Sequence, residues 1–331
     1  MDLSTSYVGL TLKSPIVPSS SPLMAHLDVL KRLEDSGAGG VVLHSLFEEQ
    51  VTNEALMIHY HTTQGTDSYA EALSYFPEPS QYIFPAEEYV EYIRKVKSSL
   101  EVPVFASING VTAGGWIRFA RLIEEAGADG IELNIYYIPT DPYTDGSTLE
   151  EAYCEVVQAV RETITIPLIV KMNPFFTSIP AMARRFCELG VNGLVLFNRF
   201  YQPDLDIENL TVSPHIVFSD SHALRLPVRW TAILYQRISA SLAISGGVHT
   251  PEDVIKGIMA GADVTMMCSA IITRGPSHIK NVIEGVKNWM ETHEYSSLTM
   301  MKGTLSQISV AEPAAYERAL YIKGLQSIRY K

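Results

Sequence analysis

The stretch Gly37-Ala38-Gly39-Gly40-Val41-Val42-Leu43-His44 holds the pattern from which the fold can be predicted. A helix-like segment ends at its first glycine, a short apolar run follows, and a polar residue closes the run. A glycine just past a helix adopts the left-handed conformation that ends it, and short apolar runs after such stops are typical of strands buried on both faces. The closing polar residue then lies at the C-terminal end of the strand.

The same pattern returns over residues 127–134, 190–198 and 261–268. With the intervening apolar runs, it predicts eight strands, near residues 16, 41, 104, 131, 168, 194, 243 and 264. Helical patterns fill most gaps, over residues 26–36, 86–99, 115–126, 149–163, 179–189, 229–239, 251–260 and 277–292. Alternating strands and helices indicate a parallel sheet, and eight pairs favour closure. We therefore expect the α/β class and a (β/α)₈ TIM barrel, whose catalytic face collects the C-terminal ends of the strands.

Length and composition fit one barrel domain with additions. The 331 residues, 47% hydrophobic, can bury a large core. We expect residues 1–292 to form the barrel, and residues 293–331 to form a helical tail, with a helix over 314–326, packed on the barrel or in a subunit contact. Residues 48–85 form a long loop after the second strand, and loops of this length on a catalytic face usually cover a ligand or build an interface.

Charge and cysteine content exclude several classes of protein. The net charge of −12 is spread along the chain without a basic patch, so we expect no nucleic-acid partner. No apolar run reaches membrane-spanning length and no signal sequence is apparent, so we expect no membrane association and a cytoplasmic protein. Cys154 and Cys187 are predicted to be inert helical thiols. His59 and His61 could share one face of a strand, but a plain loop is favoured and no metal site is expected.

Gly246-Gly247 follows the seventh predicted strand and precedes a helix start at Thr250-Pro251. Backbone N–H groups beside such glycines can bind phosphate, and barrels of this kind often bind phosphate after the seventh and eighth strands. Cys268 and Ser269 close the eighth strand with small side chains. A phosphate site is therefore predicted there.

Lys171 ends the fifth strand after four apolar residues and should face the barrel mouth, because an unpaired buried lysine is costly. Three interpretations compete. It could place a fixed positive charge near the pyrimidine edge of a flavin, form a Schiff base, or pair with Glu132 on the neighbouring strand.

Other polar side chains close the remaining strands. Asn134 and Asn198 could fix a planar heterocycle, or only tie down their own loops. His44 could donate to an anionic ligand or titrate near neutrality. Tyr136 and Tyr137 could stack, act as acid or base, or simply pack.

These residues, in this order, resemble the dihydroorotate dehydrogenase family of FMN-dependent barrels, especially its soluble branch. The resemblance covers roughly residues 1–292 and is most specific at Glu132-Leu133-Asn134-Ile135, Val170-Lys171 and Ile244-Ser245-Gly246-Gly247-Val248. It implies oxidation of dihydroorotate to orotate, a step of pyrimidine biosynthesis, in which a loop base takes a proton and flavin N5 takes a hydride. A homodimer is also implied.

The resemblance assigns roles to individual residues. It implies that Ser19, Ser20 and Ser45 line the flavin, that Asn134 and Lys171 contact its ring, and that Gly246, Gly247, Cys268 and Ser269 hold its phosphate. Asn134 and Asn198 would also face the substrate.

The substrate side departs from the family pattern at three points. The family loop after Asn134 normally reads Ser-Cys-Pro-Asn or Ser-Ser-Pro-Asn, whereas this chain has Tyr136-Tyr137-Ile138-Pro139, which puts Tyr137 in the place of the base. His44 replaces a lysine, and Arg199 replaces the serine or threonine after Asn198. His44 and Arg199 suggest an acidic group on the substrate.

Four functions stay open at this point. The first is an FMN oxidoreductase acting on the CH–CH bond of dihydroorotate. The second is the same chemistry on a different small, planar, anionic substrate. The third is a flavin electron-transfer protein that serves a redox protein partner without turning over dihydroorotate. The fourth is a Schiff-base lyase that uses Lys171.

Overall fold

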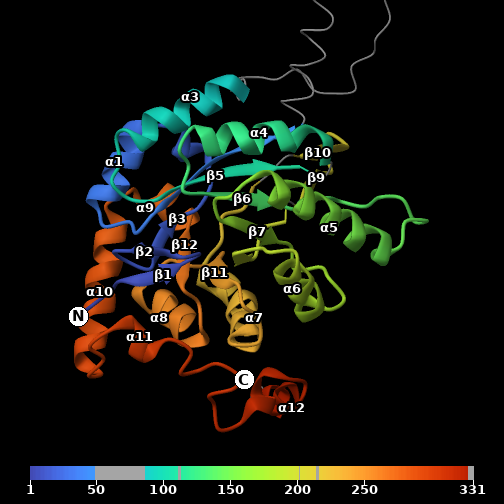
Figure 1. The fold of residues 1–331 in the computed structure, drawn as a ribbon. Coiled ribbons are helices and arrows are strands. Elements are labelled where there is room, and N and C mark those ends of the chain that lie inside the picture. The colour runs from blue at the N-terminus through green and yellow to red at the C-terminus, as the bar shows by residue number, and fades with distance from the viewer. Residues whose placement is uncertain (49–85, 111–112, 201, 214–215, 327–331) are drawn as a thin grey trace, which may run out of the picture.

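The computed structural model describes residues 1–48, 86–110, 113–200, 202–213 and 216–326, and its centre is a barrel of parallel strands surrounded by helices (Figure 1). The eight strands are β3 (Ile16–Pro18), β4 (Val41–Phe47), β5 (Val104–Asn109), β6 (Gly130–Asn134), β7 (Leu168–Met172), β8 (Gly193–Leu196), β11 (Ser241–Ser245) and β12 (Val264–Met267). Their order in the sheet is β3-β12-β11-β8-β7-β6-β5-β4, and β3 also contacts β4. The sheet is thus a nearly closed barrel, and the predicted (β/α)₈ fold is confirmed.

Helices follow the strands as the alternating pattern predicted. They are α1 (Leu27–Asp35), α3 (Ala86–Lys97), α4 (Ala113–Glu125), α5 (Gly146–Thr163), α6 (Ile179–Glu188), α7 (Arg225–Leu234), α8 (Pro251–Ala260), α9 (Ser269–Arg274) and α10 (His278–Thr292). The helix predicted over 229–239 is shifted: α7 begins at Arg225 and ends at Leu234, because Tyr235 leaves the helical conformation and Gln236 has a positive φ of 59°. The short helix α9 was not predicted.

An N-terminal hairpin, which was not predicted, closes the N-terminal end of the barrel. It pairs β1 (Thr5–Tyr7) with β2 (Leu10–Leu12). Tyr7 and Leu12 are fully buried in the interior cluster. The backbone N–H of Val8 donates to Ser241 Oγ (3.0 Å), at the start of β11. Because the barrel strands are parallel and begin at this end, their C-terminal ends all lie at the opposite, open end of the barrel.

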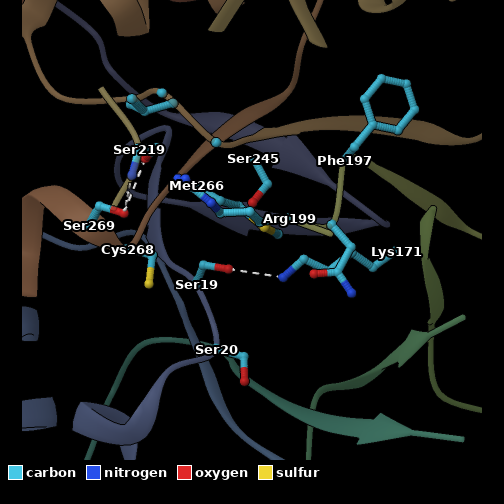
Figure 2. Close-up of a pocket in the computed structure, with 14 residues that line it drawn as sticks. Ser19, Ser20, Lys171, Phe197, Arg199, Ser219, Ser245, Met266, Cys268 and Ser269 are labelled. Carbon is cyan, nitrogen blue, oxygen red and sulfur yellow. Dashed lines mark hydrogen bonds between the residues drawn. The ribbon is translucent and has the colours of Figure 1, made fainter. Parts of the chain in front are cut away.

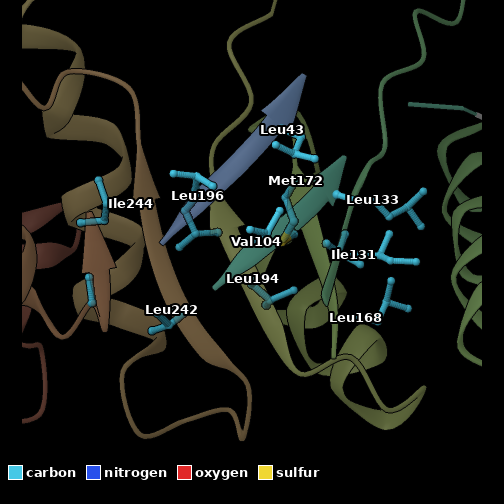
Figure 3. Packing of buried hydrophobic residues seen from close by; sticks show 14 of the residues in the cluster. Leu43, Val104, Ile131, Leu133, Leu168, Met172, Leu194, Leu196, Leu242 and Ile244 are labelled. Atoms are coloured by element: carbon cyan, nitrogen blue, oxygen red, sulfur yellow. The ribbon is translucent and has the colours of Figure 1, made fainter. Parts of the chain in front are cut away.

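A β-bulge in β4 decides which of its side chains face the interior. Val42 pairs with Phe105, but the next aligned pair is Ser45 with Ser107, so three steps along β4 match two along β5. Val42 belongs to the interior cluster, whereas Leu43 packs with the outward-facing side chains of the other strands (Figure 3). The extra residue places both Leu43 and His44 on the helix side of the strand.

The remaining elements lie outside the barrel rhythm. A hairpin of β9 (Asp204–Asp206) and β10 (Thr211–Ser213) follows β8, and the 3₁₀ helix η1 (Pro22–Ala25) follows β3. A second 3₁₀ helix, η2 (Ser221–Leu224), precedes α7. No helix among the described residues is both long and apolar enough to cross a membrane.

The C-terminal segment contains α11 (Leu298–Met301), the 3₁₀ helix η3 (Pro313–Tyr316) and α12 (Ala319–Gln326). The helix expected over 314–326 therefore begins at Ala319. The backbone N–H groups of Leu305 and Gln307 donate to carbonyls of α8 and α7, at Met259 (2.8 Å) and Ala232 (2.9 Å). The loop predicted over 48–85, with His59 and His61, lies outside the described residues except for Glu48.

Candidate functional site

A pocket opens at the C-terminal ends of the strands, and it gathers residues from both ends of the chain (Figure 2). Nine of the predicted site residues line it: Ser19, Ser20, Lys171, Asn198, Arg199, Gly246, Gly247, Cys268 and Ser269. Five further lining residues were not predicted: Phe197, Ser219, Ser245, Val248 and Met266. Lys171 and the glycine pair, more than 70 positions apart in the sequence, thus share one rim of the barrel, which we call the mouth pocket.

Lys171 lies at the base of this pocket as one member of a buried ion pair. Its Nζ donates to Glu132 Oε1 (3.2 Å) and to Ser19 Oγ (3.1 Å), the latter shown as a dashed line in Figure 2. The side chain of Glu132 is completely buried and that of Lys171 is 7% exposed. The ion pair considered from the sequence is therefore present, and it holds the ammonium group toward the mouth.

A row of polar side chains crosses four adjacent strands beside the ion pair. Asn134 Nδ2 donates to Ser107 Oγ (2.9 Å) and to the carbonyl of Ile108 (3.3 Å). Ser45 Oγ lies 2.8 Å from Ser107 Oγ and 3.1 Å from Ser20 Oγ. These contacts fix the amide of Asn134 and bring Ser20, Ser45 and Asn134 together. Ser107 was missed, because a single serine within an apolar strand carries no distinguishing signal.

The glycine pair forms a close turn on the opposite side of the pocket. Gly246 and Gly247 have positive φ angles of 92° and 82°, which favour glycine. A Cβ on Gly247 would lie 2.3 Å from the backbone nitrogen of Leu224, so only glycine fits there. Ser269 faces the same pocket, and its Oγ accepts hydrogen bonds from the backbone N–H (3.2 Å) and the hydroxyl (3.1 Å) of Ser219.

Cys268 lines the mouth pocket together with the glycine pair and Lys171. Burial raises the pKa of its thiol, an effect that the nearby positive charges of Lys171 and Arg199 partly oppose. The protonated thiol suits a packing role. Among the described residues, no group of three or more His, Cys, Asp or Glu side chains could hold a metal ion.

His44 lies away from the mouth pocket, on the helix side of β4. Its ring packs against Tyr89 (centroids 5.0 Å apart) and Tyr92 (5.5 Å) of α3. Burial lowers the pKa of the imidazole to about 4. The prediction that His44 contacts an anionic ligand is therefore corrected: the bulge in β4 gives the interior position to Ser45.

Tyr137 lines a second cavity, of about 310 Å³, next to the loops that follow β6, β7 and β8. Asn173, Phe175 and Phe200 line the same cavity. Tyr137 is 40% exposed and is not among the residues that line the mouth pocket. Tyr136, on the same loop, stacks at a tilt on Phe200, with ring centroids 4.8 Å apart.

Comparison with known proteins identifies the family. The family model for dihydroorotate dehydrogenase matches residues 81–290, which include Lys171, Asn134 and the glycine pair. The chain belongs to the dihydroorotate dehydrogenase family.

Curated relatives align along almost the whole chain. A protein of Aeropyrum pernix assigned to dihydroorotate dehydrogenase A (fumarate) is 28% identical over 312 residues, which cover 91% of this chain and 97% of the relative. The catalytic subunit of dihydroorotate dehydrogenase B (NAD(+)) of Thermoplasma acidophilum is 25% identical, with coverage of 91% and 98%. Subunit PreA of the NAD-dependent dihydropyrimidine dehydrogenase of Escherichia coli K12 is 26% identical, with coverage of 91% and 76%. This chain is accordingly an oxidoreductase of the dihydroorotate dehydrogenase type.

The predicted site residues fall into two groups, those that match the family pattern and those that depart from it. The residues that resemble the family's flavin contacts lie together in and beside the mouth pocket, from Ser19 to Ser269. The residues that depart from the family pattern are dispersed: His44 lies behind β4, Tyr137 lines the second cavity, and Arg199 lines the mouth. The residues that match the family pattern are therefore gathered at one end of the barrel, whereas those that depart from it are not.

Proposed function

We propose that this chain is an FMN-dependent dehydrogenase that oxidises a CH–CH bond in a small, planar, anionic substrate, with dihydroorotate as the first candidate. The observation that supports this most is the mouth pocket itself, where a lysine held by Glu132 faces a glycine turn and two serines. Membership of the dihydroorotate dehydrogenase family agrees with this chemistry.

The residues present fit FMN. A Cβ on Gly246 would meet no atom within 4 Å, so the turn leaves open space there, and Ser269 and Cys268 line the same pocket. Gly246, Gly247, Cys268 and Ser269 line the part of the pocket beside the turn and would hold the phosphate. The ring would occupy the open part of the mouth and contact Ser19, Ser20, Ser45, Asn134 and Lys171.

The chain's own residues would bind and orient the reactants. FMN, when bound, would supply the acceptor for a hydride, which carries the two electrons removed from the substrate. Lys171 provides a fixed positive charge where negative charge would develop on reduction, and its Glu132 and Ser19 contacts hold it in place. Arg199 and Asn198 line the same pocket and would bind the anionic group and polar edge of the substrate.

Tyr137 is the proposed base, because it occupies the base's place in the family loop; since it lines the second cavity and not the mouth pocket, the loop after β6 would have to bring its hydroxyl to the substrate. General-base catalysis contributes about 10²–10⁴-fold in rate. Tyr137→Phe should therefore slow substrate oxidation by about that factor and leave FMN binding unchanged. Equal rates for the two proteins would exclude Tyr137 as the base.

Anaerobic reduction of the bound flavin tests the proposal. The protein is reconstituted with FMN, and bleaching of the flavin absorbance is followed after addition of dihydroorotate. Bleaching supports the dihydroorotate activity. A flavoprotein that only a different small anion bleaches assigns the alternative substrate, and protein that takes up no FMN overturns the proposal. Borohydride trapping on Lys171 would instead indicate the lyase, which the pairing of its amine with Glu132 disfavours.

A redox protein is the proposed electron acceptor. Two of the relatives are named as subunits, the catalytic subunit of Thermoplasma acidophilum and PreA of Escherichia coli. Flavin that no small-molecule donor reduces, but that exchanges electrons with a redox protein, would favour the electron-transfer function over independent turnover.

A homodimer is proposed from an exposed apolar surface around the β9–β10 hairpin. Leu205, Ile207, Leu210 and Val212 are between 64% and 89% exposed. Contiguous apolar surface of this kind usually marks an interface. Light scattering should give twice the mass of 36.7 kDa for the wild type and the monomer mass for Leu210→Asp; a monomeric wild type would contradict the proposal.

A further inference from the structure

A hydrogen-bonded chain of three side chains borders the glycine turn. Ser219 Oγ lies 3.2 Å from His249 Nε2 and 3.1 Å from Ser269 Oγ. The backbone N–H of Ser219 also donates to Ser269 Oγ (3.2 Å). Figure 2 shows Ser219 and Ser269 joined at the edge of the mouth pocket, which both line. His249 does not line the pocket, so it can act there only through Ser219.

The direction of these hydrogen bonds follows from counting protons. A serine hydroxyl has one proton to donate. Ser219 donates its proton to Ser269, so the bond between Ser219 and His249 must be donated by Nε2–H of the imidazole. Ser269 Oγ already accepts two hydrogen bonds from Ser219, so its own proton is left for another acceptor, and the Ser269 side chain lines the mouth pocket.

His249 is held in place from two other elements. Its backbone N–H donates to Asp253 Oδ2 of α8 (3.0 Å), and its carbonyl accepts from Nε2 of His278 in α10 (2.8 Å). Asp220, Asp253, Arg274 and His278 are the charged and titratable groups that act on the ring, and burial lowers its pKa. A neutral imidazole with its proton on Nε2 can donate the hydrogen bond to Ser219, so His249 does not have to be protonated for this arrangement.

We propose that His249 is a positioning residue that acts through Ser219 to aim the Ser269 hydroxyl at a phosphate monoester bound beside Gly246 and Gly247. A phosphate dianion only accepts hydrogen bonds, so it needs every adjacent hydroxyl to point inward. If the ring proton were on Nδ1, Ser219 would donate its proton to His249 and could no longer donate it to Ser269. The proposal rests on the proposed function, since the phosphate monoester is that of FMN.

Comparison of FMN with riboflavin isolates this effect, because riboflavin has the same ring and side chain but no phosphate. Apo-protein of the full chain is titrated with each flavin, and quenching of flavin fluorescence gives the two dissociation constants. The variants are His249→Phe, which removes the donor, His249→Gln, which keeps an N–H donor, and Ser219→Ala, which breaks the chain. His222→Phe is the matched control, because His222 is exposed and contacts only Asp220 among the ion pairs described.

His249→Phe and Ser219→Ala should weaken FMN binding by about 10- to 100-fold, the effect of losing one hydrogen bond to a charged group, and should leave riboflavin binding unchanged. His249→Gln and His222→Phe should bind FMN within about threefold of the wild type. Equal loss for both flavins, or no loss in either donor-lacking variant, would overturn the proposal. Should His249→Phe fail to fold, Ser219→Ala still decides it. A wild type that binds neither flavin would instead refute the proposed function.

Discussion

Replacing Lys171 with methionine should destabilise the ligand-free protein strongly, because it leaves Glu132 as a buried, unpaired charge. Glu132 is completely buried, and its second oxygen, Oε2, has no hydrogen-bond partner among the described residues. At 3.2 Å, with an effective dielectric constant of about 20, the attraction that is lost is about 5 kcal/mol. Breaking a buried pair from one side typically costs about 3–5 kcal/mol of the free energy of unfolding.

The double variant Lys171→Met/Glu132→Gln separates charge from packing. Because glutamine has the shape of glutamate without the charge, it should recover at least about 2 kcal/mol of the loss. Urea denaturation of the apo-protein, followed by tryptophan fluorescence, measures the free energy of unfolding of each form. Arg94→Met, which breaks the exposed pair with Glu91, is the control and should cost less than about 1 kcal/mol. Equal stability of the single and double variants would refute the view that Glu132 carries an uncompensated charge without Lys171.

Two more substitutions test positions described above. His44→Phe should make stability less sensitive to acid. In the wild type, His44 binds a proton near pH 6.5 in the unfolded chain but only near pH 4 in the folded protein. Up to about 3 kcal/mol of the free energy of unfolding is therefore lost as the pH falls from 6.5 to 4. Denaturation at pH 7 and pH 4.5 measures the difference, and an unchanged pH dependence would contradict the assignment. Gly247→Ala should lower the melting temperature and cost at least about 2 kcal/mol more than Gly246→Ala, because its methyl group would meet the Leu224 backbone while that of Gly246→Ala meets no atom within 4 Å. Similar melting temperatures for the two variants would show that the turn can relax.

The sequence predicted the barrel because its signals are local. Gly127 and Gly190 end helices with positive φ angles of 90° and 83°, and the apolar runs after them become β6 and β8. A strand buried on both faces does not have to alternate apolar and polar side chains, so a short apolar run is enough to predict its position. The strands β1 and β2, with three residues each, are too short to give such a signal.

The site was predictable only where strand ends fix the direction of a side chain. Lys171 and Asn134 follow the regular alternation of their strands and reach the interior as expected. His44 does not, because one extra residue in β4 reverses its face and no sequence signal marks the bulge. Ser219 reaches the pocket from a long connection whose path depends on tertiary contacts, and the position of Tyr137 depends on the loop after β6 in the same way.

The β1–β2 hairpin, which closes the N-terminal end of the barrel, has a consequence for the kinetics. Tyr7 and Leu12 fill the lower end, so within the described part of the chain a small molecule approaches Lys171 from the upper rim. A reducing substrate and a small-molecule oxidant would both have to enter through the mouth pocket, so the product of the first would leave before the second binds. Initial rates measured at several fixed oxidant concentrations would then give parallel double-reciprocal lines, as in a double-displacement enzyme.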